Sequence, residues 1–150
     1  MKKDIIYVDM DGVLADFHTK RDNLPQQIKD AYENRADLIP KFFRDLPLIP
    51  GAKEAMKVLN EHFDVYILST APWNNPSAWT DKLLWVKKYL GDLAHKRLIL
   101  SHNKHLNDGD FLIDDRTANG AGDFKGEHVK FLSEEFQNWE DVLNYLIPKN

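Results

Sequence analysis

The chain has 150 residues and no cysteine, which excludes disulfide bonds, thiolate metal sites and a cysteine nucleophile. Its formal net charge of -4 offers no basic surface to a nucleic-acid polymer, so such a partner is not expected. A composition of 43% hydrophobic and 29% charged residues is ordinary for one globular domain, residues 1–150. Only a short apolar run, residues 5–8, precedes the first acidic motif. We therefore expect a cytoplasmic protein without a signal peptide or membrane partner.

The first predicted element is a buried strand at residues 5–8, where β-branched residues are followed by Asp and Gly. Asp9 and Asp11 come directly after it, at the strand end where open α/β sheets collect ligands. Two close carboxylates repel each other unless a cation or a proton intervenes, and Gly12 permits a sharp turn. The pattern favours a Mg²⁺ site with a carboxylate nucleophile, although it also fits an aspartate pair that caps the next segment.

Residues 17–47 show no strand pattern and are predicted to form a small helical cap inserted after the first strand. A helix start is expected at residues 22–25, and Pro40 and Pro47 break the segment afterwards. An insertion here is well placed to cover a site at the strand end, or it packs on the domain as a helical hairpin. The pair Phe42-Phe43 is expected to be a buried anchor rather than a wall of a ligand site.

The rest of the chain alternates helices and strands. Helices are predicted from apolar faces: Ala52, Ala55, Met56, Leu59 and Phe63; Trp79, Leu83, Val86 and Leu90, closed by Gly91; and residues 139–147, capped by Asn138. Strands are predicted at residues 65–68, 98–100, 111–113 and 128–132. This order predicts an α/β fold, a three-layer, doubly wound, mostly parallel five-stranded sheet.

Polar residues follow the later strands as well. Ser69 and Thr70 follow strand 65–68, Lys104 lies in the loop after strand 98–100, and Asp114 and Asp115 follow strand 111–113. In a parallel sheet all of these positions share one edge with the first acidic pair. Several carboxylates beside a hydroxyl and an ammonium group require a cation and an anionic ligand. The set meets the needs of phosphoryl transfer: a metal, a nucleophile, a proton donor and groups that hold phosphate oxygens.

These motifs resemble those of the haloacid dehalogenase-like (HAD) phosphatase superfamily, and within it the 5'(3')-deoxyribonucleotidase family. Residues 9–17, Asp-Met-Asp-Gly-Val-Leu-Ala-Asp-Phe, are similar to the family's first motif, Phe17 included. Residues 67–70, 98–104 and 112–116 resemble its second, third and fourth motifs. The resemblance spans nearly the whole chain. It implies a HAD-like, Rossmannoid fold and a 5'-nucleotidase of nucleotide metabolism.

The resemblance also implies roles for the acidic residues. The expected reaction is a two-step hydrolysis of (deoxy)nucleoside monophosphates, small phosphomonoesters, through an aspartyl-phosphate. Asp9 would be the nucleophile, and Asp11 would protonate the leaving oxygen and then activate water. The Mg²⁺ cofactor would be held by Asp9, the main-chain carbonyl of Asp11 and Asp115, with Asp114 supporting the site.

Substrate contacts are implied in the same way. Ser69, Thr70 and Lys104 would bind phosphate oxygens, and Phe17 matches a position that contacts substrate in the family. Trp73 is equally suited to packing and to substrate contact, and Trp79 is expected in the core.

Other functions stay open on the sequence alone. The short insertion is compatible with a HAD phosphatase of another small phosphorylated metabolite, and a weakly catalytic nucleotide- or phosphate-binding protein would carry the same motifs. A response-regulator receiver domain is disfavoured, because there the acidic pair leads the chain and the lysine comes last. Arg116 is as suited to a structural ion pair as to a substrate contact.

Overall fold

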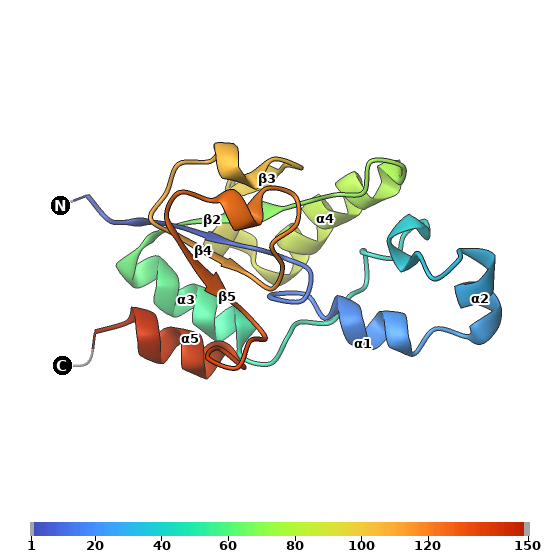
Figure 1. The fold of residues 1–150 in the computed structure, drawn as a ribbon, viewed down its shortest axis with the longest axis horizontal. Helices are drawn as coiled ribbons and strands as arrows, with labels where there is room; N and C mark the ends of the chain where they lie inside the picture. Colours follow the sequence, from blue (N-terminus) through green and yellow to red (C-terminus); the bar gives the residue numbers. More distant parts are fainter. Residues whose placement is uncertain (1, 149–150) are drawn as a thin grey trace.

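A computed structural model describes residues 2–148 and contains one five-stranded sheet with helices around it (Figure 1). The strands are β1 (Ile5–Val8), β2 (Asp64–Ser69), β3 (Leu98–Leu100), β4 (Phe111–Asp114) and β5 (Glu127–Lys130). Their order is β3-β2-β1-β4-β5, and every neighbouring pair is parallel. The predicted α/β fold and five-stranded sheet are confirmed.

Strand β1 occupies the centre of the sheet because its side chains are apolar on both faces. Ile6 and Val8 are fully buried in one apolar cluster, and Tyr7 is buried in another. In the register, Val8 lies opposite Ile67 of β2 and Ile113 of β4. The residues that follow these three strands therefore emerge side by side at one edge of the sheet.

The larger apolar core joins the sheet to the helices α3 (Ala52–His62), α4 (Pro76–Tyr89) and α5 (Trp139–Leu146). The opposite face carries a smaller cluster around Tyr7, Leu112 and Phe124. It is covered by short 3-10 turns, η3 (Lys104–Leu106) and η4 (Ala121–Asp123), instead of long helices. A further turn, η2 (Gly91–Ala94), follows α4. Within residues 2–148, no helix combines the length and apolarity that a membrane crossing requires.

The predicted faces of α3 and α5 agree with the structure, but that of α4 is wrong in part. The residues of α4 that are buried are Ala78, Asp81, Lys82, Trp85 and Val86. Trp79, expected in the core, is only half-buried, and Leu83 is exposed. The reason is that Asp81 forms an ion pair with Arg44, and Lys82 forms one with Asp11. These ion pairs allow charged side chains on the buried face of α4, where the pattern predicted apolar ones.

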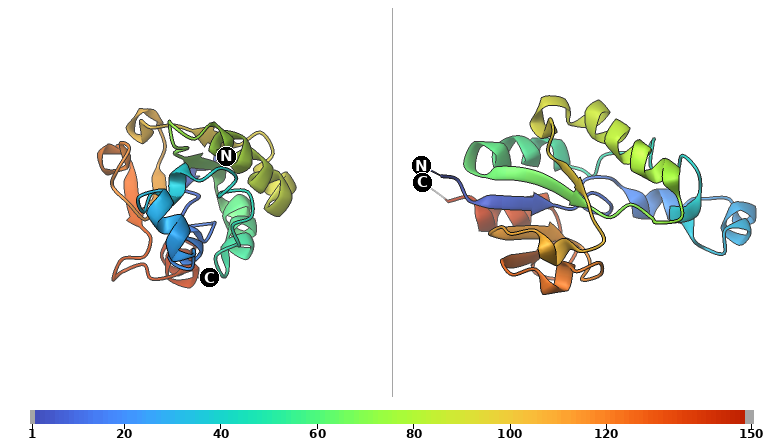
Figure 2. Two further views of the ribbon diagram at one scale, coloured as in Figure 1. Left: turned by 90° about the vertical axis from the view of Figure 1, so that its right-hand side faces the viewer. Right: turned by 90° about the horizontal axis from the view of Figure 1, so that it is seen from above.

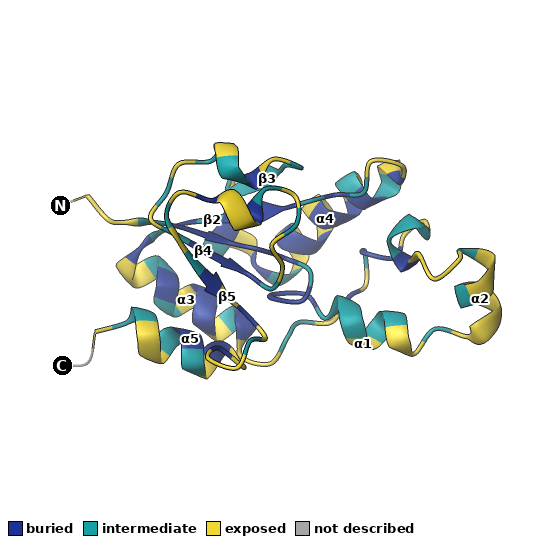
Figure 3. Cartoon of the chain, viewed as in Figure 1, coloured by how far each residue is buried: buried dark blue, intermediate teal, exposed yellow. Residues whose placement is uncertain are grey.

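Residues 17–47, here called the cap segment, project from the end of the sheet (Figures 1 and 2). They contain α1 (Phe17–Asp22), α2 (Gln26–Ala31) and η1 (Ala36–Leu38). Helix α1 was not predicted; it begins where the carboxylate of Asp16 accepts a hydrogen bond from the amide of Thr19. The predicted start at residues 22–25 is the start of α2. Figure 3 shows that α2 is largely exposed, whereas the central strands β1, β2 and β4 are mostly buried.

Polar contacts bind the cap segment to α4 and to the loop before it. Asn75 is buried, and its Nδ2 donates to the main-chain oxygens of Asp37 and Ile39 at 2.9 and 3.1 Å. Arg44 forms an ion pair, 3.0 Å long, with the fully buried Asp81 of α4. These contacts hold the segment over the ends of the strands.

We predict that Asn75→Ala loosens the cap segment. The substitution leaves the carbonyls of Asp37 and Ile39 without a donor, so the free energy of unfolding should fall by about 1–3 kcal/mol. Amide hydrogen exchange should also become faster at residues 36–43. The matched control is Asn74→Ala, an exposed neighbour whose loss should change stability by less than about 0.5 kcal/mol. Equal effects of the two substitutions would contradict the proposed anchor.

Candidate active site

Asp9 and Asp11 lie where β1 ends, in a turn that depends on Gly12. The amide of Asp9 still donates to the carbonyl of Ile113 in β4, at 2.8 Å, so this residue continues the sheet. Gly12 has a φ of 80°, and a Cβ at this position would collide with the carboxylate of Asp115. The turn therefore brings the backbone after β1 directly against the acidic pair after β4.

Lys104 joins two of the carboxylates. Its Nζ lies 3.1 Å from Oδ1 of Asp9 and 2.6 Å from Oδ2 of Asp114. Burial lowers the pKa of Lys104, but the two carboxylates outweigh this effect and leave the pKa raised, so the side chain stays charged. The other oxygen of Asp114 accepts a hydrogen bond from the amide of Arg116 at 2.9 Å. Both carboxylate oxygens of Asp114 are therefore engaged by protein donors.

Asp115 differs from its neighbour in having a free oxygen. Its Oδ2 lies 3.2 Å from Nε2 of His18, whereas its Oδ1 is buried without a hydrogen-bond partner among the described residues. Carboxylate oxygens of Asp9, Asp114 and Asp115 lie within 4.8 Å of one another. Burial, and then the charge of Asp9, raises the pKa of both Asp114 and Asp115. Crowded carboxylates with an unpartnered oxygen form a candidate site for a hard cation.

A second buried lysine, Lys82 of α4, was missed in the sequence. It is 0% exposed, and its Nζ lies 2.7 Å from Oδ2 of Asp11 and 2.9 Å from Oγ of Ser69. The ammonium group also lies 4.6 Å from the ring centroid of Phe43. Burial raises the pKa of Asp11, while the positive charge of Lys82 opposes that shift. Asp11 is thus held by a cation that is separate from the one beside Asp9.

A small inner cavity of about 50 Å³ lies at the strand ends. Its wall includes Asp9, Asp11, Thr70, Lys104, Asp114 and Arg116. The hydroxyl of Thr70 donates to the main-chain oxygen of Ser101 at 2.7 Å. Ser69 is fully buried beside Lys82. The structure therefore brings Asp9, Asp11, Thr70, Lys104 and Asp114 together around this cavity, whereas Ser69, Asp115 and Phe17 are not part of its wall. The roles of all these residues toward a phosphate stay predictions.

An outer cleft of about 630 Å³ separates the cap segment from the sheet and is large enough for a small ligand. On the cap side it is lined by residues including Phe17, His18, Arg21, Arg35 and Phe43; on the sheet side, by residues including Thr70, Trp73, His102, Asp115 and Arg116. The outer cleft adjoins the inner cavity, because four residues line both spaces: Asp11, Thr70, Arg116 and Asn119. Arg116 is exposed and has no side-chain ion pair within residues 2–148.

Aromatic rings lie on both sides of the cleft. The ring of Phe17 is stacked on Phe42 and Phe43, with centroid distances of 5.2 and 5.7 Å. Phe42 and Phe43 are buried, as predicted, but Phe43 also lines the cleft, contrary to the expectation that the pair would not form a wall of a ligand site. Across the cleft, Trp73 is 77% exposed and meets His102 edge to face, at 6.0 Å between centroids. Packing explains the position of the phenylalanines, but it does not explain the exposed indole.

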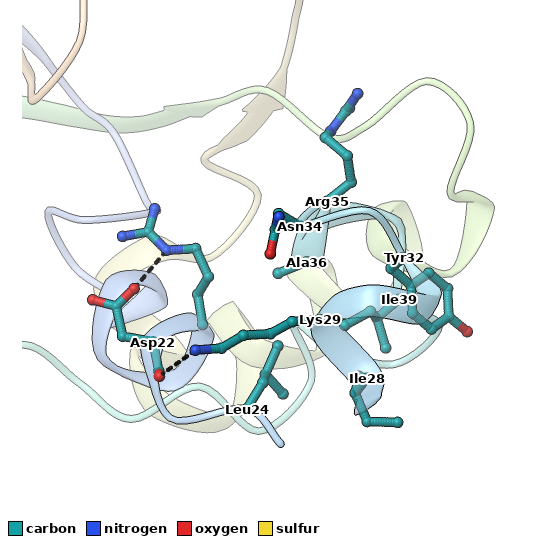
Figure 4. A pocket seen from close by; sticks show the side chains of 10 residues that line it. Asp22, Leu24, Ile28, Lys29, Tyr32, Asn34, Arg35, Ala36 and Ile39 are labelled. Carbon is teal, nitrogen blue, oxygen red and sulfur yellow. Dashed lines mark hydrogen bonds and ion pairs between the residues drawn. The ribbon is translucent and has the colours of Figure 1, made fainter. Parts of the chain in front are cut away.

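A further cavity of about 300 Å³ lies within the cap segment (Figure 4). Leu24, Ile28, Ala36 and Ile39 provide its apolar wall. The side chain of Lys29 crosses this space and donates to the main-chain oxygen of Asp22 at 2.9 Å. None of the four aspartates at the strand ends lines the cavity, so it is separate from the charged site.

Sequence and structure comparisons find relatives along nearly the whole chain. The sequence model of the family described as "5' nucleotidase, deoxy (Pyrimidine), cytosolic type C protein" matches residues 23–144. A "putative 5'(3')-deoxyribonucleotidase" of Vibrio phage KVP40 is 55% identical over 148 residues, covering 99% of this chain and 87% of that protein. A protein of the same description from Bordetella bronchiseptica is 34% identical, with 93% and 95% covered.

Among solved structures, the "putative HAD-hydrolase YfnB" from Bacillus subtilis, bound to magnesium, superposes with a TM-score of 0.64. The superposition covers 99% of this chain and 100% of the other, at 13% identity. At this identity the likeness concerns the fold alone.

We predict that Asp115→Asn stabilises the metal-free protein at alkaline pH. Burial and Asp9 raise the pKa of Asp115 to about 7 in the folded state, so ionised Asp115 weakens the fold above its unfolded pKa of about 4. In EDTA at pH 8 the variant should therefore melt at a higher temperature than the wild type. The difference should shrink as the pH falls toward 4, where the wild-type carboxyl is itself protonated. Asp123→Asn, an exposed control, should show no such trend.

Proposed function

Because the chain belongs to the 5'(3')-deoxyribonucleotidase family of HAD-like hydrolases, we propose that it hydrolyses (deoxy)nucleoside monophosphates with Mg²⁺, through an aspartyl-phosphate. One observation carries the proposal. Lys104 bridges Asp9 and Asp114, while Asp11 next to them keeps its Oδ1 buried and without a hydrogen-bond partner among the described residues. Asp9 is thus held beside the cation of Lys104, whereas Asp11 is held through Oδ2 by Lys82 and keeps Oδ1 available for proton exchange.

The acidic cluster fits a bound Mg²⁺. Asp9 and Asp115 would hold the ion together with the main-chain carbonyl of Asp11, and Asp114 would support them. The free Oδ1 of Asp115 supports its choice as the ligand, because both oxygens of Asp114 already accept hydrogen bonds from Lys104 and Arg116. When bound, such an ion neutralises the crowded carboxylates and offsets the negative charge of a phosphoryl group.

In the first half of the proposed reaction, Asp9 is the nucleophile. A carboxylate oxygen of Asp9 attacks phosphorus, the bond from phosphorus to the nucleoside oxygen breaks, and a proton passes from Asp11 to that leaving oxygen. The burial that raises the pKa of Asp11 favours a carboxyl group that still carries this proton. Lys104 holds Asp9 in place and adds positive charge beside the phosphoryl oxygens.

In the second half, water attacks the phosphorus of the aspartyl-phosphate. Asp11, now ionised, takes the proton of that water, and the bond between phosphorus and the Asp9 oxygen breaks to release phosphate. The same carboxyl group therefore acts first as an acid and then as a base. Its position next to Asp9 on one turn makes this double use geometrically reasonable.

The two adjoining spaces suggest how a nucleotide would lie. The phosphate would occupy the inner cavity with Thr70, Ser69 and Lys104, and the nucleoside would extend into the outer cleft. There the base would stack on Trp73, whose ring is exposed, with Phe17 on the opposite side. Stacking on an aromatic ring tolerates any base, so Trp73 would contribute affinity for the nucleoside without selecting between bases.

We predict that Asp9→Asn abolishes Mg²⁺-dependent phosphate release while the fold persists. Loss of the nucleophile should lower kcat by at least about a thousandfold, equal to about 4 kcal/mol of activation free energy. The measurements are phosphate release with and without EDTA, circular dichroism, and acid trapping of radiolabelled phosphoenzyme.

Asp92→Asn changes an exposed aspartate of η2 and is the matched control. Unimpaired turnover by Asp9→Asn would refute the nucleophile. Failure to trap a phosphoenzyme in wild type and in Asp11→Asn would argue against the covalent route.

The substrate class is tested with a panel of deoxynucleoside and ribonucleoside 5'- and 3'-monophosphates and small sugar phosphates. We expect the deoxynucleotides to have the highest kcat/KM. Trp73→Ala should raise KM for nucleotides about tenfold, or about 1.4 kcal/mol, and leave sugar phosphates unaffected. Tyr145→Ala, which removes an exposed ring on α5 outside the cleft, serves as the control. A clear preference for sugar phosphates would show a phosphatase of another metabolite.

A further inference from the structure

Lys82 stands out because nothing in the proposed chemistry requires it. The motifs already supply one lysine, Lys104, beside the nucleophile. Lys82 comes instead from the helix α4, which packs in the apolar core, and its side chain is completely shielded from solvent. A buried ammonium group is costly unless partners surround it. Its three contacts, with Asp11, Ser69 and the ring of Phe43, are therefore the reason that it is tolerated.

The contact with Asp11 is selective for one oxygen. Lys82 donates to Oδ2 at 2.7 Å, whereas Oδ1 has no hydrogen-bond partner within residues 2–148. An aspartate side chain without this contact would rotate about its Cβ–Cγ bond and present either oxygen. With Oδ2 fixed, Oδ1 is the oxygen left to exchange a proton with a ligand. The contact with Lys82 therefore leaves Oδ1 as the oxygen of Asp11 that is available for proton transfer.

The contact with Ser69 has a matching consequence. Lys82 has only donors, so the Ser69 oxygen accepts this hydrogen bond, 2.9 Å long, and the hydroxyl hydrogen remains free to donate elsewhere. Ser69 ends β2 at the same edge as Asp11. One ammonium group therefore orients an acid from the turn after β1 and a hydroxyl donor from the end of β2.

We propose that Lys82 is a positioning residue that fixes the carboxyl group of Asp11 for proton transfer to the leaving oxygen and directs the Ser69 hydroxyl toward the phosphate. Lys82 lines neither the inner cavity nor the outer cleft, so it would act through Asp11 and Ser69 rather than on the substrate. The inference rests on the proposed function, because it assigns to Asp11 the role of general acid. It extends that function by adding a residue from α4 that lies outside all four motifs.

The proposal is tested with two substrates that differ in their need for an acid. A nucleotide has a poor alkoxide leaving group, whereas 4-nitrophenyl phosphate has a good phenolate leaving group that departs with little protonation. Because kcat/KM reports steps up to formation of the phosphoenzyme, it isolates the first proton transfer. Lys82→Met should lower kcat/KM for the nucleotide about 10- to 100-fold more than for the aryl ester. Lys87→Met, at an exposed position of the same helix, should lower neither.

A double-mutant cycle with Asp11→Asn separates positioning from a general loss of structure. If Lys82 acts through Asp11, Lys82→Met should cause little further loss on the nucleotide once Asp11 is already Asn. Losses that multiply, or a Lys82→Met variant that slows both substrates equally, would overturn the proposal. If Lys82→Met does not fold, Lys82→Gln retains a hydrogen-bond donor and should show a smaller leaving-group effect in the same direction. A wild-type protein inactive on both substrates would instead refute the proposed function.

Discussion

The structure depends on how four aspartates are accommodated at one edge of a sheet. Parallel strands bring their carboxyl ends together, so Asp9, Asp11, Asp114 and Asp115 converge whatever their charge. Buried carboxylates are unfavourable without partners, and the chain supplies two buried ammonium groups, Lys82 and Lys104, from opposite sides. The charge balance remains incomplete, because Asp11 and Asp115 each keep one oxygen that has no hydrogen-bond partner in the part of the chain that the structure describes. A divalent cation would satisfy that deficit.

Much of this arrangement could be predicted from the sequence, because each strand is a run of apolar residues that ends in polar ones. The ends of parallel strands share an edge, so knowing the strands was enough to place Asp9, Lys104 and Asp114 at the same edge, but not to show that Lys104 contacts the other two. Helix α1 was not predicted, because its six residues are too few to reveal a helical spacing of apolar side chains. Only its cap residue, Asp16, signalled the start.

Lys82 could not be predicted for a different reason. An apolar pattern assigns charged residues to the surface, and its partner Asp11 lies 71 positions away in the chain. The spacing of Ala78, Lys82 and Trp85 does place the lysine on the buried face of α4, but that signal is visible only when the face is already known. The contacts of Lys82 with Asp11 and Ser69 therefore follow from tertiary structure rather than from the motifs.

Helix α4 links the two halves of the site. Its consecutive residues Asp81 and Lys82 are both fully buried, and each pairs with a different part of the molecule. Asp81 holds Arg44 of the cap segment, whereas Lys82 holds Asp11 after β1. A displacement of this helical turn would move the wall of the cleft and the carboxyl group of Asp11 together. One turn of α4 therefore anchors both the cap segment and the carboxyl group of Asp11, and these two ion pairs account for charged residues at positions where the sequence pattern calls for apolar side chains.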